Sequence, residues 1–163
     1  MRLATASAKA REQRTVPRLR DLPRAEWIGA MHAYQGSGLP GFLDIEVLEL
    51  APGRMRARMA LREELMMASG DFLHGGTVAS FADMSAGWGT CASLPDDVDG
   101  ATTGEMKVNI VATTRVPDAL LSVATMLHGG RTTQVWDVTV MRESDGRDIA
   151  YFRCTQHLLR PRG

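Results

Sequence analysis

The order of the predicted elements indicates an α+β fold in which one antiparallel sheet curls around a single long helix. Two strand patterns come first, a long segment of small and apolar residues follows, and four more strand patterns complete the chain. A run of antiparallel strands with one helix to cover its apolar face is typical of the α+β class. The length of 163 residues fits one such domain with a short appended segment.

The first 24 residues differ in composition from the rest and predict a basic N-terminal extension. They carry seven basic residues against two acids, with serine and alanine among them. Such a segment is either a solvated, partly disordered tail or a weak match to an organelle transit peptide. It has no apolar core of a secretory signal, so we do not expect export. Residues 25–163 are predicted to form the single domain.

The elements before the long helix are a short helix and a hairpin. Apolar residues recur at helical spacing from Pro23 to about Gln35, and the glycine- and proline-containing run 36–41 ends that pattern. Strands are then predicted over 43–50 and 54–61, joined by a turn at 51–53. The second strand alternates strictly between an apolar set and a basic set, which indicates one buried and one wet face. The apolar set is Met55, Ala57, Met59 and Leu61, and the basic set is Arg54, Arg56 and Arg58.

A loop over 62–73 leads to the long helix, predicted over about 75–93. One face of this helix consists of small residues, so a sheet can wrap closely around it. Gly87 and Gly89 each cost the helix about 1 kcal/mol relative to alanine, which suggests close packing or the approach of a ligand. Four strands are predicted to follow. Their ranges are 102–112, 119–128, 132–142 and 148–159, with turns at 128–131 and 143–146.

Composition excludes several classes of function. Positive and negative charges balance and aromatic residues make up 6% of the chain, so we expect no nucleic-acid partner. No apolar run approaches the ~20 residues that span a bilayer, so we expect no membrane partner. Cys91 and Cys154 match no metal spacing and fit a reduced, cytoplasmic setting. The chain has neither a Gly-x-Ser-x-Gly elbow nor a phosphate-binding Gly-Lys-Ser/Thr loop.

The most informative segment is 70–90, in which His-Gly-Gly opens the long helix. Gly75 and Gly76 allow a substrate close to the backbone, and a helix N-terminus offers free N–H groups to an oxyanion. Asp83 lies two turns further on among small and apolar residues, where a carboxylate can act as base or nucleophile. We expect His74 to shape the turn by hydrogen bonding rather than to act as a general base, since no orienting acid is near it. The second His-Gly-Gly, at 128–130, is most simply a turn.

His-Gly-Gly followed by an acid on a small-residue helix resembles the hotdog-fold acyl-CoA thioesterases. Within them the chain is most similar to the phenylacetate-degradation (PaaI-like) subgroup, which has Asp on the helix where another subgroup has Glu. The resemblance extends over about residues 40–159 and includes segments 102–110, 130–133 and 150–155. It implies the hotdog fold, in which an antiparallel sheet wraps around one central helix.

The resemblance also implies roles for individual residues. Gly75 matches the N–H that polarises the thioester carbonyl, Asp83 the catalytic carboxylate, and Thr103 a hydroxyl that helps to hold the attacking water. Relatives commonly carry Asn or Gln six residues before the histidine, and this chain has Ala68 there. Ser69 or an unidentified group must then replace that amide, or turnover suffers. Losing one such positioned group typically costs ~10²–10³ in rate.

The sequence therefore predicts an acyl-CoA thioesterase that cleaves a small aromatic or medium-chain acyl-CoA to free acid and CoA. No metal or organic cofactor is expected, and CoA enters as part of the substrate. The resemblance implies that helix and loop come from different subunits of a homodimer or homotetramer. The alternative is a non-catalytic acyl-CoA-binding module, favoured by Ala68; a hotdog dehydratase is weaker because it needs an Asp–His pair. The catalytic candidates are Asp83, Gly75, His74 and Thr103, and the substrate-binding candidates are Gly76, Ser69, Met67 and Arg131.

Overall fold

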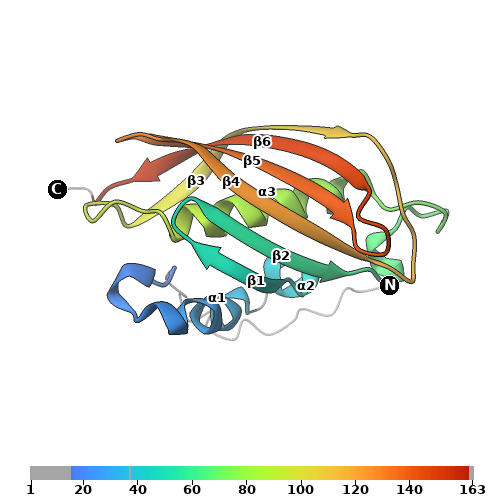
Figure 1. The fold of residues 1–163 in the computed structure, drawn as a ribbon, viewed down its shortest axis with the longest axis horizontal. Helices are drawn as coiled ribbons and strands as arrows, with labels where there is room; N and C mark the ends of the chain where they lie inside the picture. The colour runs from blue at the N-terminus through green and yellow to red at the C-terminus, as the bar shows by residue number, and fades with distance from the viewer. Residues whose placement is uncertain (1–15, 37, 162–163) are drawn as a thin grey trace, which may run out of the picture.

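A computed structural model describes residues 16–36 and 38–161, and its centre is a six-stranded antiparallel sheet wrapped around one long helix, α3 (Figure 1). The strands lie in the order β1-β2-β4-β5-β6-β3. This is the predicted α+β architecture, with every strand of the sequence-based prediction present within a few residues. The elements are β1 (Glu46–Ala51), β2 (Arg54–Ala60), α3 (Gly75–Cys91), β3 (Gly100–Ile110), β4 (Ala119–Gly129), β5 (Thr133–Arg142) and β6 (Asp148–Leu159).

The prediction was wrong between the first helix and the first strand. The run predicted only to break the helix contains a second short helix, α2 (Leu39–Leu43), and β1 starts at Glu46 rather than at 43. Pro40 sits in the first turn of α2, where its missing N–H costs nothing. Asp44 ends α2 in the left-handed conformation, with φ of 52°. Leu43, the first residue of the predicted strand, therefore belongs to a helical turn.

The described part of the basic extension packs against the domain. It forms the 3₁₀ turns η1 (Leu19–Asp21) and η2 (Arg24–Glu26) and leads into α1 (Trp27–Gln35). Leu19 is only 1% exposed. Arg20 donates from Nη1 to the carbonyls of Pro95 and Val98, over 2.6 and 3.1 Å. Residues 16–24 are thus joined to the segment after α3, and the part of the prediction on residues 1–15 lies outside the described residues.

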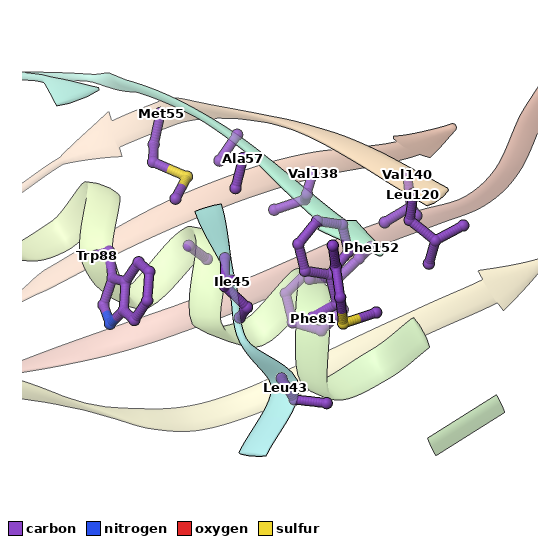
Figure 2. Close-up of a cluster of buried hydrophobic side chains, with 14 of the residues drawn as sticks. Leu43, Ile45, Met55, Ala57, Phe81, Trp88, Leu120, Val138, Val140 and Phe152 are labelled. Carbon is purple, nitrogen blue, oxygen red and sulfur yellow. The ribbon is translucent and has the colours of Figure 1, made fainter. Parts of the chain in front are cut away.

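The core lies between α3 and the concave face of the sheet (Figure 2). The apolar set of β2 is buried as its alternation predicted, and Phe81 of α3 packs among side chains from the opposite strands. Gly89 is required by this packing, because a Cβ there would lie 2.7 Å from the ring of Trp136. Gly87 has no such neighbour within 4 Å of a Cβ position. Close packing therefore accounts for Gly89 alone of the two helix glycines.

The two edges of the sheet are finished differently. At β1, side chains of α1 occupy the free backbone groups: His32 Nε2 accepts from the N–H of Val47 over 2.9 Å. The Gln35 amide donates to the carbonyl of Ile45 over 2.7 Å and accepts from its N–H over 3.2 Å. At the other edge, β3 has β6 on one side and no described strand on the other. An uncovered edge is a ready template for pairing with another chain.

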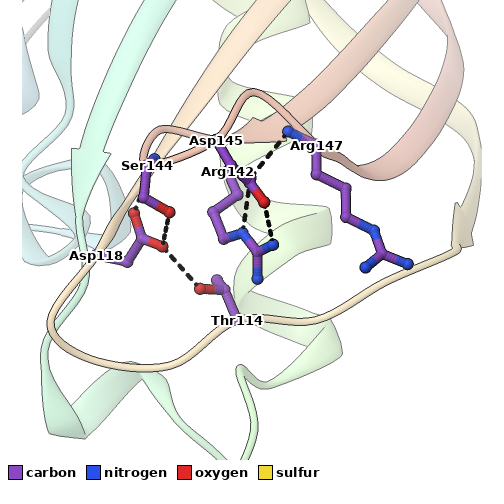
Figure 3. A network of polar contacts seen from close by, with 6 residues as sticks. All are labelled: Thr114, Asp118, Arg142, Ser144, Asp145 and Arg147. Atoms are coloured by element: carbon purple, nitrogen blue, oxygen red, sulfur yellow. Dashed lines mark hydrogen bonds and ion pairs between the residues drawn. The ribbon is translucent and has the colours of Figure 1, made fainter.

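A polar network ties the β5–β6 turn to the loop before β4 (Figure 3). The Asp118 carboxylate accepts hydrogen bonds from the Thr114 hydroxyl (3.1 Å), the Ser144 hydroxyl (2.9 Å) and the N–H of Ala119 (2.8 Å). Burial alone would raise the pKa of Asp118, but these hydrogen bonds outweigh it and lower the pKa below its ordinary value. This carboxylate is therefore satisfied within its own chain.

Candidate active site

The first turn of α3 leaves one backbone N–H without an acceptor. His74 caps the helix, and its Nδ1 accepts from the N–H of Gly76 over 2.9 Å. The N–H groups of Thr77 and Val78 both bond to the His74 carbonyl. Within the described residues, the N–H of Gly75 has no acceptor. His74 thus shapes the turn, as predicted, while Gly75 rather than Gly76 presents a free donor.

The loop before α3 fixes the position of this donor. The N–H of His74 donates to the Leu65 carbonyl and the N–H of Leu73 to the Thr114 carbonyl, over 3.2 and 3.1 Å. The N–H of Met67 donates to the Phe72 carbonyl over 2.7 Å and closes the loop, and both of these apolar side chains are exposed. The free N–H therefore sits at the end of an anchored loop that offers apolar surface.

Asp83 lies half-buried in the middle of α3 and accepts a hydrogen bond from Thr103. Thr103 Oγ1 donates to Asp83 Oδ1 over 2.8 Å, from the start of β3. Burial raises the pKa of Asp83, and the hydrogen bond from Thr103 opposes that rise without cancelling it. A carboxylate whose proton affinity is raised is better suited to take a proton from water near neutral pH. The structure thus brings together the two side chains, Asp83 and Thr103, that the sequence analysis had singled out separately.

The sequence analysis missed Gln156, which completes this cluster. Gln156 is 2% exposed, and its Nε2 donates to Thr103 Oγ1 over 2.8 Å and to Cys154 Sγ over 3.4 Å. The alternation of β6 could have revealed it, since Gln156 stands between Cys154 and Leu158 on the apolar side of the strand. A buried amide needs hydrogen-bond partners, so an amide at such a position indicates a polar network.

The remaining candidates lie in two places. Ala68 and Ser69 are exposed in the turn that the N–H of Gly70 closes onto the Met67 carbonyl over 2.7 Å. Arg131 lies elsewhere, in the β4–β5 hairpin, where its carbonyl accepts from Nη2 of Arg160. Arg160 also pairs with Asp97, which follows the C-terminal end of α3. Arg131 is therefore near the end of α3 opposite to Gly75, and the structure does not bring it to the other candidates.

Two kinds of feature are absent from the described residues. In the part of the chain that the structure describes, no group of three or more His, Cys, Asp or Glu side chains could hold a metal ion. No helix among those residues has the length and hydropathy that crossing a membrane requires.

Gly75 and Asp83 of one chain are too far apart to act on one carbonyl group. They are eight residues apart on α3, which corresponds to about 12 Å along the helix axis. A base within reach of an attacking water and a donor on the carbonyl oxygen must both lie about 3 Å from the reacting atoms. Within one chain the Gly75 N–H and the Asp83 carboxylate therefore lie at two separate places.

Comparison with known proteins identifies the family. The family model of the thioesterase superfamily matches residues 70–149, which include the first turn of α3, Asp83 and Thr103. The matched segment, 80 of the 163 residues, belongs to the thioesterase superfamily. The chemistry of that superfamily is thioester hydrolysis, and the sheet of this chain, wrapped around α3, is the hotdog fold that the resemblance implied.

One curated protein and several solved structures are similar to this chain. A protein of Halobacterium salinarum whose name gives it as a candidate esterase is 28% identical over 114 residues, or 68% of this chain and 74% of its own. The Escherichia coli PaaI protein, from the phenylacetic acid degradation operon, has a TM-score of 0.72 at 20% identity, covering 86% of this chain and 96% of its own. A hypothetical thioesterase of Streptococcus pneumoniae, solved with coenzyme A, has a TM-score of 0.65 at 21% identity over 73% and 88%.

Proposed function

We propose that this chain is an acyl-CoA thioesterase whose site combines Asp83 of one subunit with the Gly75 N–H of another. The observation that carries the proposal is the separation of about 12 Å between the two groups within one chain. Both are prepared for acyl transfer, since the Gly75 N–H has no acceptor among the described residues and burial raises the proton affinity of Asp83. In a pair of chains, Asp83 of one subunit and the Gly75 N–H of the other together complete each site.

The open edge of β3 is the surface through which two copies would pair. Its inward-facing side chains include Met106 and Ile110, which are 49% and 47% exposed in the single chain. Ile110 also adjoins the candidate site, because its Cδ1 lies 3.0 Å from where a Cβ of Gly75 would be. Pairing at β3 would cover these apolar groups and bring a second α3 alongside the first. This supports a homodimer as the smallest active unit, with a homotetramer as a larger assembly of it.

The chemistry follows from the two groups. Asp83 takes a proton from water, and the resulting hydroxide adds to the thioester carbon. The carbonyl oxygen becomes an oxyanion that accepts from the Gly75 N–H at the positive end of α3. The C–S bond then breaks, CoA leaves as a thiolate that takes up the proton, and the free acid remains. In the alternative path Asp83 attacks directly, and water hydrolyses the transient anhydride.

The surroundings of Gly75 support an apolar acyl group. Met67 and Phe72 expose their side chains on the anchored loop just before α3, and methionine adapts to several chain shapes. The Streptococcus pneumoniae relative was solved with coenzyme A, which supports CoA as the carrier. A small aromatic or medium-chain acyl group fits this description.

Ala68 favours a second candidate, a module that binds acyl-CoA without cleaving it. In the resemblance this position carries an amide that orients water, and here it is an exposed methyl group in a turn. The Asp83 carboxylate argues for the enzyme, because a binder has no use for a base with raised proton affinity beside a thioester.

Release of free thiol from a panel of aryl- and alkyl-CoA esters decides between the two candidates. We expect turnover by the native chain on at least one ester class and a loss of about 10³-fold in Asp83→Asn, which has the same shape and no base. The best ester names the substrate class. Tight binding of the esters without turnover by either protein would reject the enzyme and support the binding module.

A further inference from the structure

Two hydrogen bonds in series connect the buried amide of Gln156 to the carboxylate of Asp83. Gln156 Nε2 donates to Thr103 Oγ1, and Thr103 Oγ1 donates to Asp83 Oδ1, each over 2.8 Å. Gln156 is 2% exposed, so it does not reach the substrate itself. We infer that Gln156 is a positioning residue that fixes the Thr103 hydroxyl as a donor to Asp83 and so holds this carboxyl ready to take a proton from water. The inference rests on the proposed function of Asp83.

The direction of the hydrogen bonds follows from the inventory of the hydroxyl group. A threonine hydroxyl has one proton and two lone pairs. The N–H of Gln156 occupies one lone pair, so the proton cannot point at Gln156. Asp83 Oδ1 is then the acceptor that remains within reach. Without Gln156 the hydroxyl rotor is free to turn away, and Asp83 loses a donor for part of the time.

The orientation of the Gln156 amide is itself selected by the charge on Asp83. If the amide were reversed, its Oε1 would face Thr103 Oγ1, and the hydroxyl would have to donate to Gln156. Asp83 Oδ1 would then lie 2.8 Å from Oγ1 with no proton between them. That contact is repulsive for an ionised carboxylate and tolerable only for a protonated one. Protonation of Asp83 therefore changes the preferred orientation of the Gln156 amide, through the hydroxyl of Thr103.

The titration of this cluster is that of Asp83. Among the groups that face α3 from the described strands, β2, β4 and β5 present apolar or neutral side chains, and β6 presents the Cys154 thiol. Burial, with a smaller contribution from the charge of Asp83, raises the pKa of Cys154 to about 11, and burial likewise raises that of Cys91 on α3 to about 11. Both thiols stay neutral below pH 9. Of the charged groups on β3, β5 and β6, five lie on the opposite face of the sheet: Glu105, Lys107, Asp137, Arg153 and His157. The other two lie at strand ends, where Arg142 donates to Asp145 and Asp148 accepts from the hydroxyl of Tyr151.

The chain offers a matched control in Gln134. It lies directly opposite Gln156 in the β5–β6 ladder and is also 2% exposed. Its amide bonds instead to the carbonyl of Ser93 and to Nε1 of Trp136. Gln156→Met and Gln134→Met therefore remove equally buried amides from the same region, and only the first touches the Asp83 cluster.

The experiment measures kcat/KM against pH, which reports the free enzyme. In Gln156→Met we expect the acidic limb to move to higher pH by about one unit, because a hydrogen bond to a charged group contributes on that scale. The rate on that limb falls about tenfold, while KM and the plateau value of kcat change by less than about threefold. Gln134→Met leaves the limb in place. In a Thr103→Val background, Gln156→Met adds no further shift. A limb that stays in place in Gln156→Met, or moves equally in both glutamine variants, overturns the inference.

A second readout does not depend on activity or on the folding of Gln156→Met. Carbon-13 NMR of carboxyl-labelled aspartate follows the ionisation of Asp83, assigned by its loss in Asp83→Asn. In the native chain the side-chain amide signals of Gln156 should change with the same midpoint, and in Thr103→Val they should not. Amide signals that ignore the ionisation of Asp83 in the native chain contradict the inference. If no ester is cleaved, the proposed function fails, and the NMR titration still decides whether Gln156 senses Asp83.

Discussion

Asp83 and Asp118 are two partly buried carboxylates of the same chain in opposite electrostatic states. Asp118 accepts hydrogen bonds from side chains and backbone of two loops, and its pKa is lowered despite burial (Figure 3). Among the described residues Asp83 has one donor, the hydroxyl of Thr103, and burial raises the pKa of Asp83. The hydrogen-bonding capacity of Asp118 is filled by groups of its own chain, whereas that of Asp83 is filled only in part. A partly buried carboxylate that is short of donors is typical of a functional group, and one that is fully bonded is typical of a structural group.

The sharpest way to break this comparison is to neutralise each carboxylate in turn. Asp83→Asn should lower kcat by about 10³-fold because it removes the base. Asp118→Asn should leave kcat within about twofold, since a structural network contributes nothing to the transition state. Thiol release from the best CoA ester measures both. Equal losses in the two variants would mean that their environments do not separate the roles.

The other half of the site is tested by removing a single backbone N–H. Gly75→Pro lacks this donor but fits the first helical position, and His74 before it already has the extended conformation that proline requires. Gly75→Ala adds the same Cβ next to Ile110 and keeps the N–H. We expect kcat to fall by about 10²-fold or more in Gly75→Pro relative to Gly75→Ala. A similar rate in the two variants would remove Gly75 as the oxyanion donor.

The stability of the two asparagine variants should differ in sign. Asp118→Asn weakens or loses several hydrogen bonds at once and should lower the free energy of unfolding by about 1–2 kcal/mol. Asp83→Asn removes a carboxylate that burial disfavours, and should raise it by up to about 1 kcal/mol at neutral pH. Urea unfolding at pH 7 measures both. Destabilisation by Asp83→Asn would show that the Thr103 hydrogen bond outweighs the cost of burial.

The pH dependence of stability gives the smallest and most specific difference. Because the folded pKa of Asp118 lies below its ordinary value of 3.8, its contribution is present above pH 3.8 and is lost as the pH falls through the folded value. The folded pKa of Asp83 lies above 3.8, so its cost is present at high pH and is relieved as the pH falls through that value. Asp118→Asn should therefore reduce the fall in the free energy of unfolding below pH 3.8. Asp83→Asn should abolish the rise in that free energy that occurs as the pH falls through the folded pKa of Asp83 towards 3.8. Unfolding curves between pH 3 and 7 test this, and identical slopes in the two variants would contradict it.

Much of the fold and part of the site could be predicted from the sequence. Period-two alternation placed the strands, and the Gly-containing helix start located Gly75 and Asp83, because both signals are local. The turn-shaping role of His74 was also correct, since its partner is two residues away. What local patterns could not give was a contact across the sheet. Gln156 is 53 residues from Thr103, and only the register of β6 with β3 brings them together.

The prediction was wrong over α2 because the local pattern itself was ambiguous. Its apolar residues are compatible with a strand end or a helical turn, and a short run does not separate the two periods. The decision came from Asp44, whose left-handed conformation ends the helix and redirects the chain into β1. Arg131 was predicted only from its position beside a turn. In the structure it lies near the C-terminal end of α3, away from Gly75.

The most direct test of the central claim, that each site is shared between two chains, mixes two inactive variants. Asp83→Asn supplies an intact Gly75 N–H, and Gly75→Pro supplies an intact Asp83. After dissociation and re-pairing in equal amounts, half of the dimers are mixed and each has one complete site of two, so thiol release should recover to about one quarter of the native rate. Recovery near that level supports the shared site. No recovery, with mixed dimers verified by mass spectrometry, would place the whole site within one chain and contradict the account.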